Sequence, residues 1–275
     1  MIVDSHHHLW EIGRFGYPWM PGPGHLLHGD FLPEDLKPWL DKNAVDKTVI
    51  VQADQSVQET RWLLAHAEKH EFVAGVVGWV DLKDPEVGAV LDNLAQAPWF
   101  KGVRHVWHDE PDNDWIVQPE VIRGLREVAA RGLTYDFLTF PQHLKLIPEV
   151  MERVPGLRPV VDHISKPPIR SGGLEPWRSD LRKVAEIPGV CCKLSGMVTE
   201  ADFDKWTIED LRPYVNAVIE MFGCDRLMYG SDWPVCTMAA NYDRVFEAAQ
   251  TLLSGVSEDD RRAVFGENAI QFYRL

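Results

Sequence analysis

Two histidines near the amino terminus have the spacing of a shared binding site. His6 and His8 are separated by one residue, in a short run that starts with the apolar Val3. On a β-strand, alternate side chains point to the same face, so these two imidazoles lie together while His7 points away. Such a pair can bind one metal ion or one polar substrate atom, and it also fits two ordinary strand histidines without a ligand.

Polar residues also end several apolar runs further along the chain. They are Arg104 and His105, Tyr135 and Asp136, Asp162 and His163, Lys193, and Ser231 and Asp232. If these runs are parallel strands of one barrel, their carboxyl ends meet on the face where such barrels carry their active sites. We therefore expect these side chains to gather near the histidine pair.

Eight short runs rich in valine and isoleucine alternate with helical patterns, which predicts repeated βα units and a parallel sheet. The predicted strands are Ile2–His8, Thr48–Gln52, Val73–Val80, Gly102–Trp107, Leu133–Leu138, Pro159–His163, Val190–Leu194 and Leu227–Ser231. Eight such units indicate an α/β fold of the (β/α)8 TIM-barrel type. The length of 275 residues fits one domain over residues 1–275.

Helix signals lie between these runs. Ser56 and Glu59 have the spacing of a capping box before an apolar stretch. Pro148 interrupts the helical pattern of residues 144–154, and an interior proline removes a hydrogen bond. The helix of that segment is therefore expected to start late or to bend.

Composition narrows the classes of partner. The chain has 28 Lys and Arg against 42 Asp and Glu, a formal charge of -14, which disfavours binding to nucleic acid. It shows no signal-peptide pattern and no long apolar run, so we expect a cytoplasmic protein with no membrane segment. The four cysteines lack a Cys-x-x-Cys spacing and are expected to be reduced thiols.

An ordered set of motifs resembles the amidohydrolase superfamily over the whole chain. The motifs are His6-x-His8, Val-Val-Asp-His163, Gly-Ser-Asp232-Trp-Pro and the closing Phe265-Gly-Glu-Asn-Ala. Lys193-Leu-Ser-Gly, the run Asp-His163-Ile-Ser-Lys-Pro and the early Trp10 are similar to the lactonase branch. That branch includes lactonases of L-fuconolactone, L-rhamnonolactone and 2-pyrone-4,6-dicarboxylate. The resemblance implies a hydrolase that opens a sugar-derived lactone, a small molecule, to its hydroxy acid.

Two departures from this superfamily limit the metal site. Binuclear relatives use a lysine late on strand four, whereas Arg104 and His105 stand there and Lys101 lies at the start of the strand. The predicted fifth strand, 133–138, also lacks the histidine of metal-rich relatives. A binuclear centre is therefore not expected. The remaining ligand set either binds one divalent ion, with zinc as the expected metal, or forms a metal-independent pocket: His6, His8, His163 and Asp232.

Opening a lactone requires a polarised carbonyl, an activated water and a proton for the leaving alkoxide. We expect Asp232 to deprotonate the water and to return that proton to the ring oxygen. His6, His8 and His163 are expected to polarise the carbonyl, either by hydrogen bonds or through a metal ion that acts as a Lewis acid.

Six further residues near strand ends are predicted to bind the substrate ring. Three are hydrogen-bond donors and three are aromatic: Arg104, Lys193, Tyr135, Trp10, Trp107 and Trp233. For the two cations the alternative is an ion pair with Asp136 or Asp162, and for the tryptophans it is core packing. His105 and Asp136 are expected to be structural. His25 and His28 receive no role.

Two other classes of function fit the same fold. One is a metal-dependent decarboxylase of an unsaturated or aromatic carboxylic acid, which requires a firmly held metal ion. The other is a catalytically silent binding protein, which is disfavoured because binding alone does not need the water-activating carboxylate of Asp232.

Overall fold

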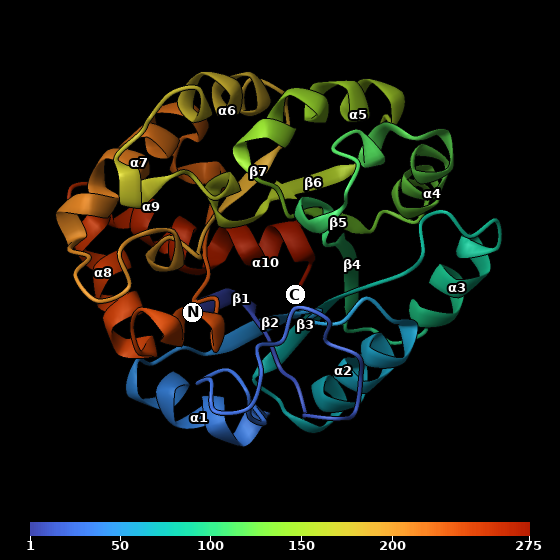
Figure 1. Cartoon of the computed structure of the whole chain (residues 1–275), viewed down its shortest axis with the longest axis horizontal. Helices are drawn as coiled ribbons and strands as arrows, with labels where there is room; N and C mark the ends of the chain where they lie inside the picture. Colours follow the sequence, from blue (N-terminus) through green and yellow to red (C-terminus); the bar gives the residue numbers. More distant parts are fainter.

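Eight parallel strands form the centre of the molecule. In the computed structural model, which describes residues 1–275, they are neighbours in the order β1 to β8. Their bounds are β1 Val3–His7, β2 Lys47–Val51, β3 Val73–Gly78, β4 Phe100–His105, β5 Thr134–Phe137, β6 Arg158–Val161, β7 Cys191–Leu194 and β8 Leu227–Tyr229. Helices surround this ring of strands (Figure 1). The predicted (β/α)8 barrel is confirmed.

The helices alternate with the strands along the chain. They are α1 Pro33–Lys42, α2 Val57–Lys69, α3 Val87–Leu94, α4 Pro119–Ala130, α5 Ile147–Arg153, α6 Trp177–Ala185, α7 Ile208–Phe222, α8 Tyr242–Leu252, α9 Glu258–Arg262 and α10 Asn268–Tyr273. Ser56 caps α2, because its hydroxyl accepts a hydrogen bond from the Glu59 amide at 3.1 Å. As expected from Pro148, α5 starts late, with the proline in its first turn, where no helical bond is lost.

The barrel closes between β8 and β1 without a continuous ladder. An isolated bridge joins His7 to Trp233, and the His8 amide donates to the Trp233 carbonyl at 2.7 Å. The Ser5 hydroxyl donates to the Tyr229 carbonyl at 2.6 Å. This seam brings the first and last strands together.

The carboxy-terminal helix α10 covers the end of the barrel at which the strands begin. Phe272 and Tyr273 pack against a small apolar cluster that includes Val3, Val49 and Met228 from the strands. The main cluster of the core lies between the sheet and the surrounding helices. The barrel interior beside α10 is thus largely apolar, and Tyr273 of α10 donates a hydrogen bond to the buried carboxylate of Asp136 at 2.9 Å.

The cysteines and the helices bear on two expectations from the sequence. All four cysteines are free. None of the helices combines the length and the apolar character needed to cross a bilayer.

Candidate active site

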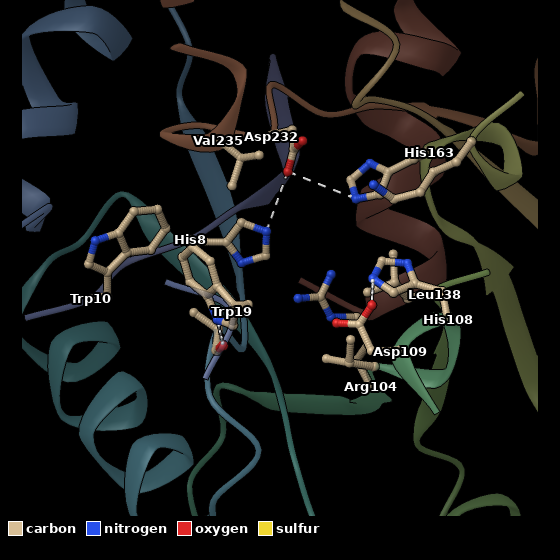
Figure 2. A pocket seen from close by; sticks show the side chains of 13 residues that line it. His8, Trp10, Trp19, Arg104, His108, Asp109, Leu138, His163, Asp232 and Val235 are labelled. Atoms are coloured by element: carbon tan, nitrogen blue, oxygen red, sulfur yellow. Dashed lines mark hydrogen bonds and ion pairs between the residues drawn. The ribbon is translucent and has the colours of Figure 1, made fainter. Parts of the chain in front are cut away.

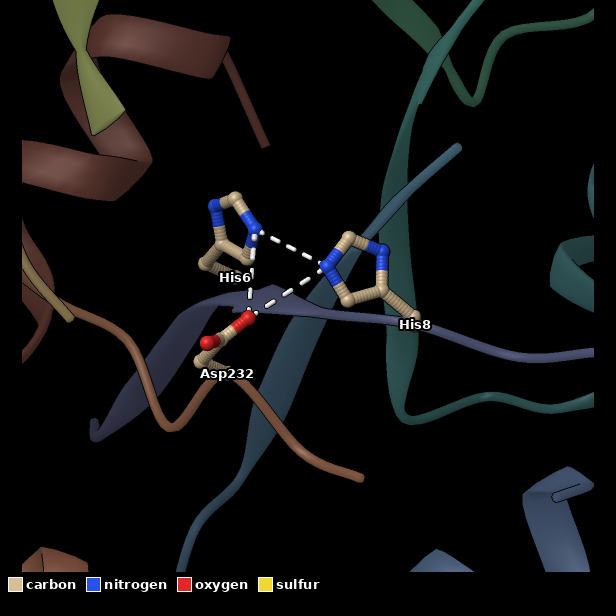
Figure 3. Close-up of side chains that lie close together, drawn as sticks. All are labelled: His6, His8 and Asp232. Carbon is tan, nitrogen blue, oxygen red and sulfur yellow. Dashed lines mark hydrogen bonds and ion pairs between the residues drawn. The ribbon is translucent and has the colours of Figure 1, made fainter. Parts of the chain in front are cut away.

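Three histidines surround the carboxylate of Asp232 at the carboxyl ends of the strands. Asp232 Oδ1 lies 3.4 Å from His8 Nε2, 3.8 Å from His6 Nε2 and 3.9 Å from His163 Nε2. The two Nε2 atoms of His6 and His8 are 3.2 Å apart (Figure 3). All four side chains are buried. The structure thus brings together the four residues that the sequence predicts to be metal ligands and catalytic groups.

The backbone positions Asp232 against the first strand. Its φ of 58° lies in the left-handed region, which is uncommon for a residue with a side chain. The Asp232 amide donates to the His6 carbonyl at 2.8 Å. One residue earlier, the Ser231 amide donates to the buried carboxylate of Asp4 at 2.9 Å, and Tyr242 donates to that carboxylate at 3.0 Å. These bonds hold Asp232 at a defined register beside His6.

His163 follows β6 in an unusual turn. Its φ is 54°, and the next three residues also have positive φ values. The imidazole Nδ1 lies 2.8 Å from the Ser195 hydroxyl, which orients the ring so that Nε2 faces Asp232. A Cβ atom on Gly196 would lie 2.5 Å from His163 Nδ1, so only glycine leaves room for this ring. The turn and the glycine together bring His163 into the site.

The hydrogen bonds of His6 and His8 assign the hydrogens on their rings. His8 Nδ1 donates to the Val51 carbonyl at 2.8 Å, which leaves a lone pair on His8 Nε2. Lys193 Nζ lies 3.1 Å from His6 Nδ1 and donates to it, so His6 Nε2 carries the hydrogen and donates to His8 Nε2. Burial lowers the pKa of His6 and of His163 well below the ordinary value, which keeps both rings neutral.

The donor set fits a divalent ion. Tetrahedral zinc with bonds of about 2.0–2.1 Å separates its ligand atoms by about 3.4 Å. The three edges between His6 Nε2, His8 Nε2 and Asp232 Oδ1 measure 3.2, 3.4 and 3.8 Å. Neutral imidazoles with a carboxylate are a usual zinc ligand set. With a metal ion bound, the hydrogen of His6 would lie on Nδ1, where Asp162 Oδ1 at 3.4 Å could accept a hydrogen bond from it, and Lys193 would no longer donate to that nitrogen.

Lys193 lies beneath the histidines and does not line the pocket. Its Nζ is 2.6 Å from Asp136 Oδ2 and 3.1 Å from Asp162 Oδ1, and all three side chains are fully buried. Burial raises the pKa of Asp136 to about 6, although Lys193 opposes the shift. Burial also acts to raise the pKa of Asp162, but the nearby cations outweigh it and the pKa is lowered. Lys193 therefore forms the ion pairs that were its alternative role.

Arg104 lines the pocket, and its guanidinium also contacts other groups of the protein. Nη1 lies 3.4 Å from Asp162 Oδ2 and 3.5 Å from His6 Nε2, and Nη2 donates to the Gln52 carbonyl. The side chain is 5% exposed. Arg104 is thus both a pocket residue and part of the ion-pair network.

Besides Lys193, three more of the predicted substrate contacts lie outside the pocket. Tyr135 faces the core, where its ring packs on Phe137 with centroids 4.9 Å apart. Trp107 is fully buried and donates from Nε1 to the Asn113 carbonyl at 3.0 Å. Trp233 is buried against Phe31. Contacts within the protein therefore account for the positions of these three side chains, and no substrate contact is required.

A cavity of about 210 Å³ is lined by His8, His163 and Asp232, and His6 lies buried behind them. This cavity is smaller than the cavities of about 300–1,000 Å³ that hold drug-sized ligands, so it suits a single ring. Figure 2 shows Trp10 and Trp19 on one side and His108 and Asp109 on the other, with Asp232 between them. Trp10 lines the cavity, as the sequence predicts.

The sequence prediction missed several pocket residues. They include Trp19, Ala53, His108, Asp109, Leu138, Lys166 and Val235. Most of them follow a strand end within a few residues, which is the one signal that could have identified them.

His25, His28 and His105 do not line the pocket. His28 Nδ1 lies 2.8 Å from the Pro21 carbonyl, and His25 Nδ1 accepts from the Leu27 amide at 3.1 Å. His105 uses both ring nitrogens, with Glu110 at 2.7 Å and the Trp79 indole at 3.1 Å.

Comparison with known proteins agrees with this geometry. The model of a family described as amidohydrolase matches residues 3–275. The chain belongs to the amidohydrolase family. This amidohydrolase is 40% identical over 278 residues to an L-fucono-1,5-lactonase from Burkholderia ambifaria, an alignment that covers 99% of this chain and 95% of the relative. An L-rhamnono-gamma-lactonase from Scheffersomyces stipitis is 27% identical over 207 residues, which covers 66% of this chain and 61% of that one.

Solved structures are similar over the whole length of this amidohydrolase. A Burkholderia multivorans amidohydrolase with bound zinc has a TM-score of 0.94 and 34% identity, with 100% of this chain and 99% of that chain covered. A probable 2-pyrone-4,6-dicarboxylic acid hydrolase from Acinetobacter baumannii and a 5-carboxyvanillate decarboxylase from Novosphingobium aromaticivorans have TM-scores of 0.81 and 0.73. Their identities are 17% and 14%, so they share the fold alone.

Proposed function

We propose that this amidohydrolase hydrolyses a sugar-derived lactone to the corresponding hydroxy acid. The observation that carries the proposal is the Asp232 carboxylate, which lies within 3.4 to 3.9 Å of three imidazoles below a cavity sized for one ring. The L-fucono-1,5-lactonase relative, at 40% identity, supports a lactone as the substrate.

Asp232 acts as the general base and then as the general acid. Its carboxylate takes a proton from a water molecule, whose oxygen adds to the lactone carbonyl carbon. When the bond between that carbon and the ring oxygen breaks, Asp232 returns the proton to the departing alkoxide. The products are one carboxylic acid and one hydroxyl group on the same open chain, and Asp232 is restored.

Without a metal ion, His6 is the histidine placed to stabilise the oxyanion that forms at the carbonyl, because His8 Nε2 carries a lone pair. The hydrogen that His6 carries on Nε2 bonds to His8 Nε2 in the free protein, and it would turn to the carbonyl oxygen when the substrate is bound. We also propose that His6, His8, His163 and Asp232 are the residues that hold a single zinc ion when one is bound. Such an ion supplies Lewis-acid polarisation of the carbonyl.

Arg104 and Trp10 are the predicted substrate contacts that line the cavity, and we propose that both touch the ring. Arg104 offers hydrogen bonds from its guanidinium, and Trp10 offers an aromatic surface to the apolar face of the ring. The decarboxylase alternative has less support, because the similar decarboxylase structure shares only the fold.

A pH-indicator assay on a panel of aldonolactones, with and without a chelator, tests the proposal. We expect hydrolysis of at least one lactone by the native protein. Asp232→Asn should lower kcat by about 10²- to 10⁴-fold, the usual contribution of a general base, while circular dichroism shows an intact fold. If the zinc-loaded protein hydrolyses no lactone, or if the Asn variant retains the native rate, the proposal is wrong.

A further inference from the structure

The cations beside the cavity are already paired within the protein. Lys166 Nζ lies 3.1 Å from Glu200 Oε1. The Arg104 guanidinium is held by the Asp162 carboxylate and the Gln52 carbonyl. A carboxylate on a substrate would have to compete with these internal partners for either cation.

Asp109 is different, because no hydrogen bond from the protein reaches its carboxylate. Its nearest partner is His108, whose Nε2 lies 3.3 Å from Asp109 Oδ1. Burial lowers the pKa of His108 to about 3, so this imidazole is neutral and does not cancel the charge of Asp109. The Asp109 side chain is 61% exposed and lines the cavity. It therefore presents free acceptor atoms and a negative charge to a bound ring.

The short helical turn Trp107–Asp109 holds this carboxylate in place. Trp107 is fully buried, and the Val106 amide donates to Gln55 Oε1 at 3.0 Å. The opposite wall of the cavity is formed by Trp10 and Trp19, whose rings are 5.0 Å apart (Figure 2). A ring between the walls thus has one aromatic side and one side with an acidic acceptor.

We propose that Asp109 determines substrate specificity, by accepting a hydrogen bond from a ring hydroxyl and by repelling lactones that carry a carboxylate. The inference rests on the proposed lactonase function and goes beyond it, because it selects neutral polyhydroxy lactones over acidic ones. Two effects combine: a hydrogen bond to a charged acceptor is stronger than one to a neutral acceptor, and like charges close together repel.

The test compares two lactones with the same ring hydroxyls: a neutral aldonolactone and the aldarolactone that bears an added carboxylate. We expect Asp109→Asn to lower kcat/KM for the neutral lactone about 10-fold, the loss of one charge-assisted hydrogen bond. The ratio of kcat/KM for the two lactones should shift toward the acidic one. Asp114→Asn is the matched control, since it removes the same charge from an exposed position outside the cavity lining.

A second variant tests the charge argument by freeing a cation beside the cavity instead of removing an anion. Glu200→Gln removes the partner of Lys166 and frees that cation. We expect it to raise kcat/KM for the acidic lactone while that for the neutral lactone stays within about twofold, the scale of a surface ion pair. An unchanged specificity ratio in both Asp109→Asn and Glu200→Gln overturns the proposal.

Binding measurements separate this inference from the proposed function. Calorimetry with the corresponding neutral aldonolactam, which resists hydrolysis, reports recognition without turnover. If the native protein binds the lactam about 10-fold more tightly than Asp109→Asn but hydrolyses no lactone, only the proposed function fails. If lactones are hydrolysed and the lactam binds both proteins equally, only the role of Asp109 fails. Absence of both hydrolysis and binding overturns both.

Discussion

Replacing Lys193 by methionine tests whether the buried charge network beneath the histidines stabilises the fold. Methionine keeps an unbranched side chain but removes the ammonium that lies 2.6 Å from Asp136 and 3.1 Å from Asp162. Removal of one partner from a buried ion pair costs about 3–5 kcal/mol. Because Asp162 keeps Arg104 at 3.4 Å, we expect a loss near the lower limit, about 3 kcal/mol in the free energy of unfolding.

The loss from Lys193→Met should depend on pH. Burial raises the pKa of Asp136 to about 6 with the lysine present, and removal of the cation raises that pKa further. A carboxyl with a raised folded-state pKa stabilises the fold at low pH, and that stabilisation is lost as the pH rises through the folded-state pKa. The variant should therefore be less destabilised at pH 5.5 than at pH 8.

Urea unfolding followed by tryptophan fluorescence measures both effects. Adding Asp136→Asn to Lys193→Met should recover most of the loss, since the amide needs no cation. Lys183→Met is the matched control, because Lys183 is 64% exposed and solvent screens its ion pair with Asp180. A Lys193→Met protein that unfolds within about 1 kcal/mol of the native protein at pH 8 would refute the reasoning.

Two further substitutions have defined outcomes. Gly196→Ala places a Cβ 2.5 Å from His163 Nδ1, so kcat in the lactone assay should fall at least about 10-fold; an unchanged kcat would contradict the fit. Burial lowers the pKa of His7 to about 3, so the fold loses stability as the pH falls from about 6.5 toward 3. His7→Gln should reduce the difference in unfolding free energy between pH 7 and pH 5 by about 2 kcal/mol. An unaltered difference in urea titrations would argue against this.

The sequence predicted the barrel and the central residues because both depend on short-range patterns. Val- and Ile-rich runs mark each strand, and two-residue alternation places His6 and His8 together. The predicted ends were less accurate. The run predicted to end at Trp107 ends at His105, because the chain turns there into a short helix.

Side-chain direction was the part that sequence reasoning could not supply. Tyr135 and Asp136 are adjacent on β5, yet Asp136 contacts Lys193 inside the barrel while Tyr135 packs in the outer core. A polar strand end alone does not tell which of two neighbours points inward, nor how deep Lys193 lies. His108 and Asp109 line the cavity from a short helical turn. The residue spacing of strands and helices does not predict the direction of side chains in such a turn.

The seam between β8 and β1 also links the binding of ligands to folding. Ser231 and Asp4, which are hydrogen-bonded across it, are 227 residues apart in the chain, and Asp232 joins the histidines only when the seam is closed. A ligand that contacts both Asp232 and the histidines therefore binds only to the closed barrel. At a free concentration 1,000 times its dissociation constant it adds about 4 kcal/mol to the closed state. A bound substrate or ion contacts residues from both ends of the chain. It therefore lowers the population of molecules in which β1 and β8 have separated.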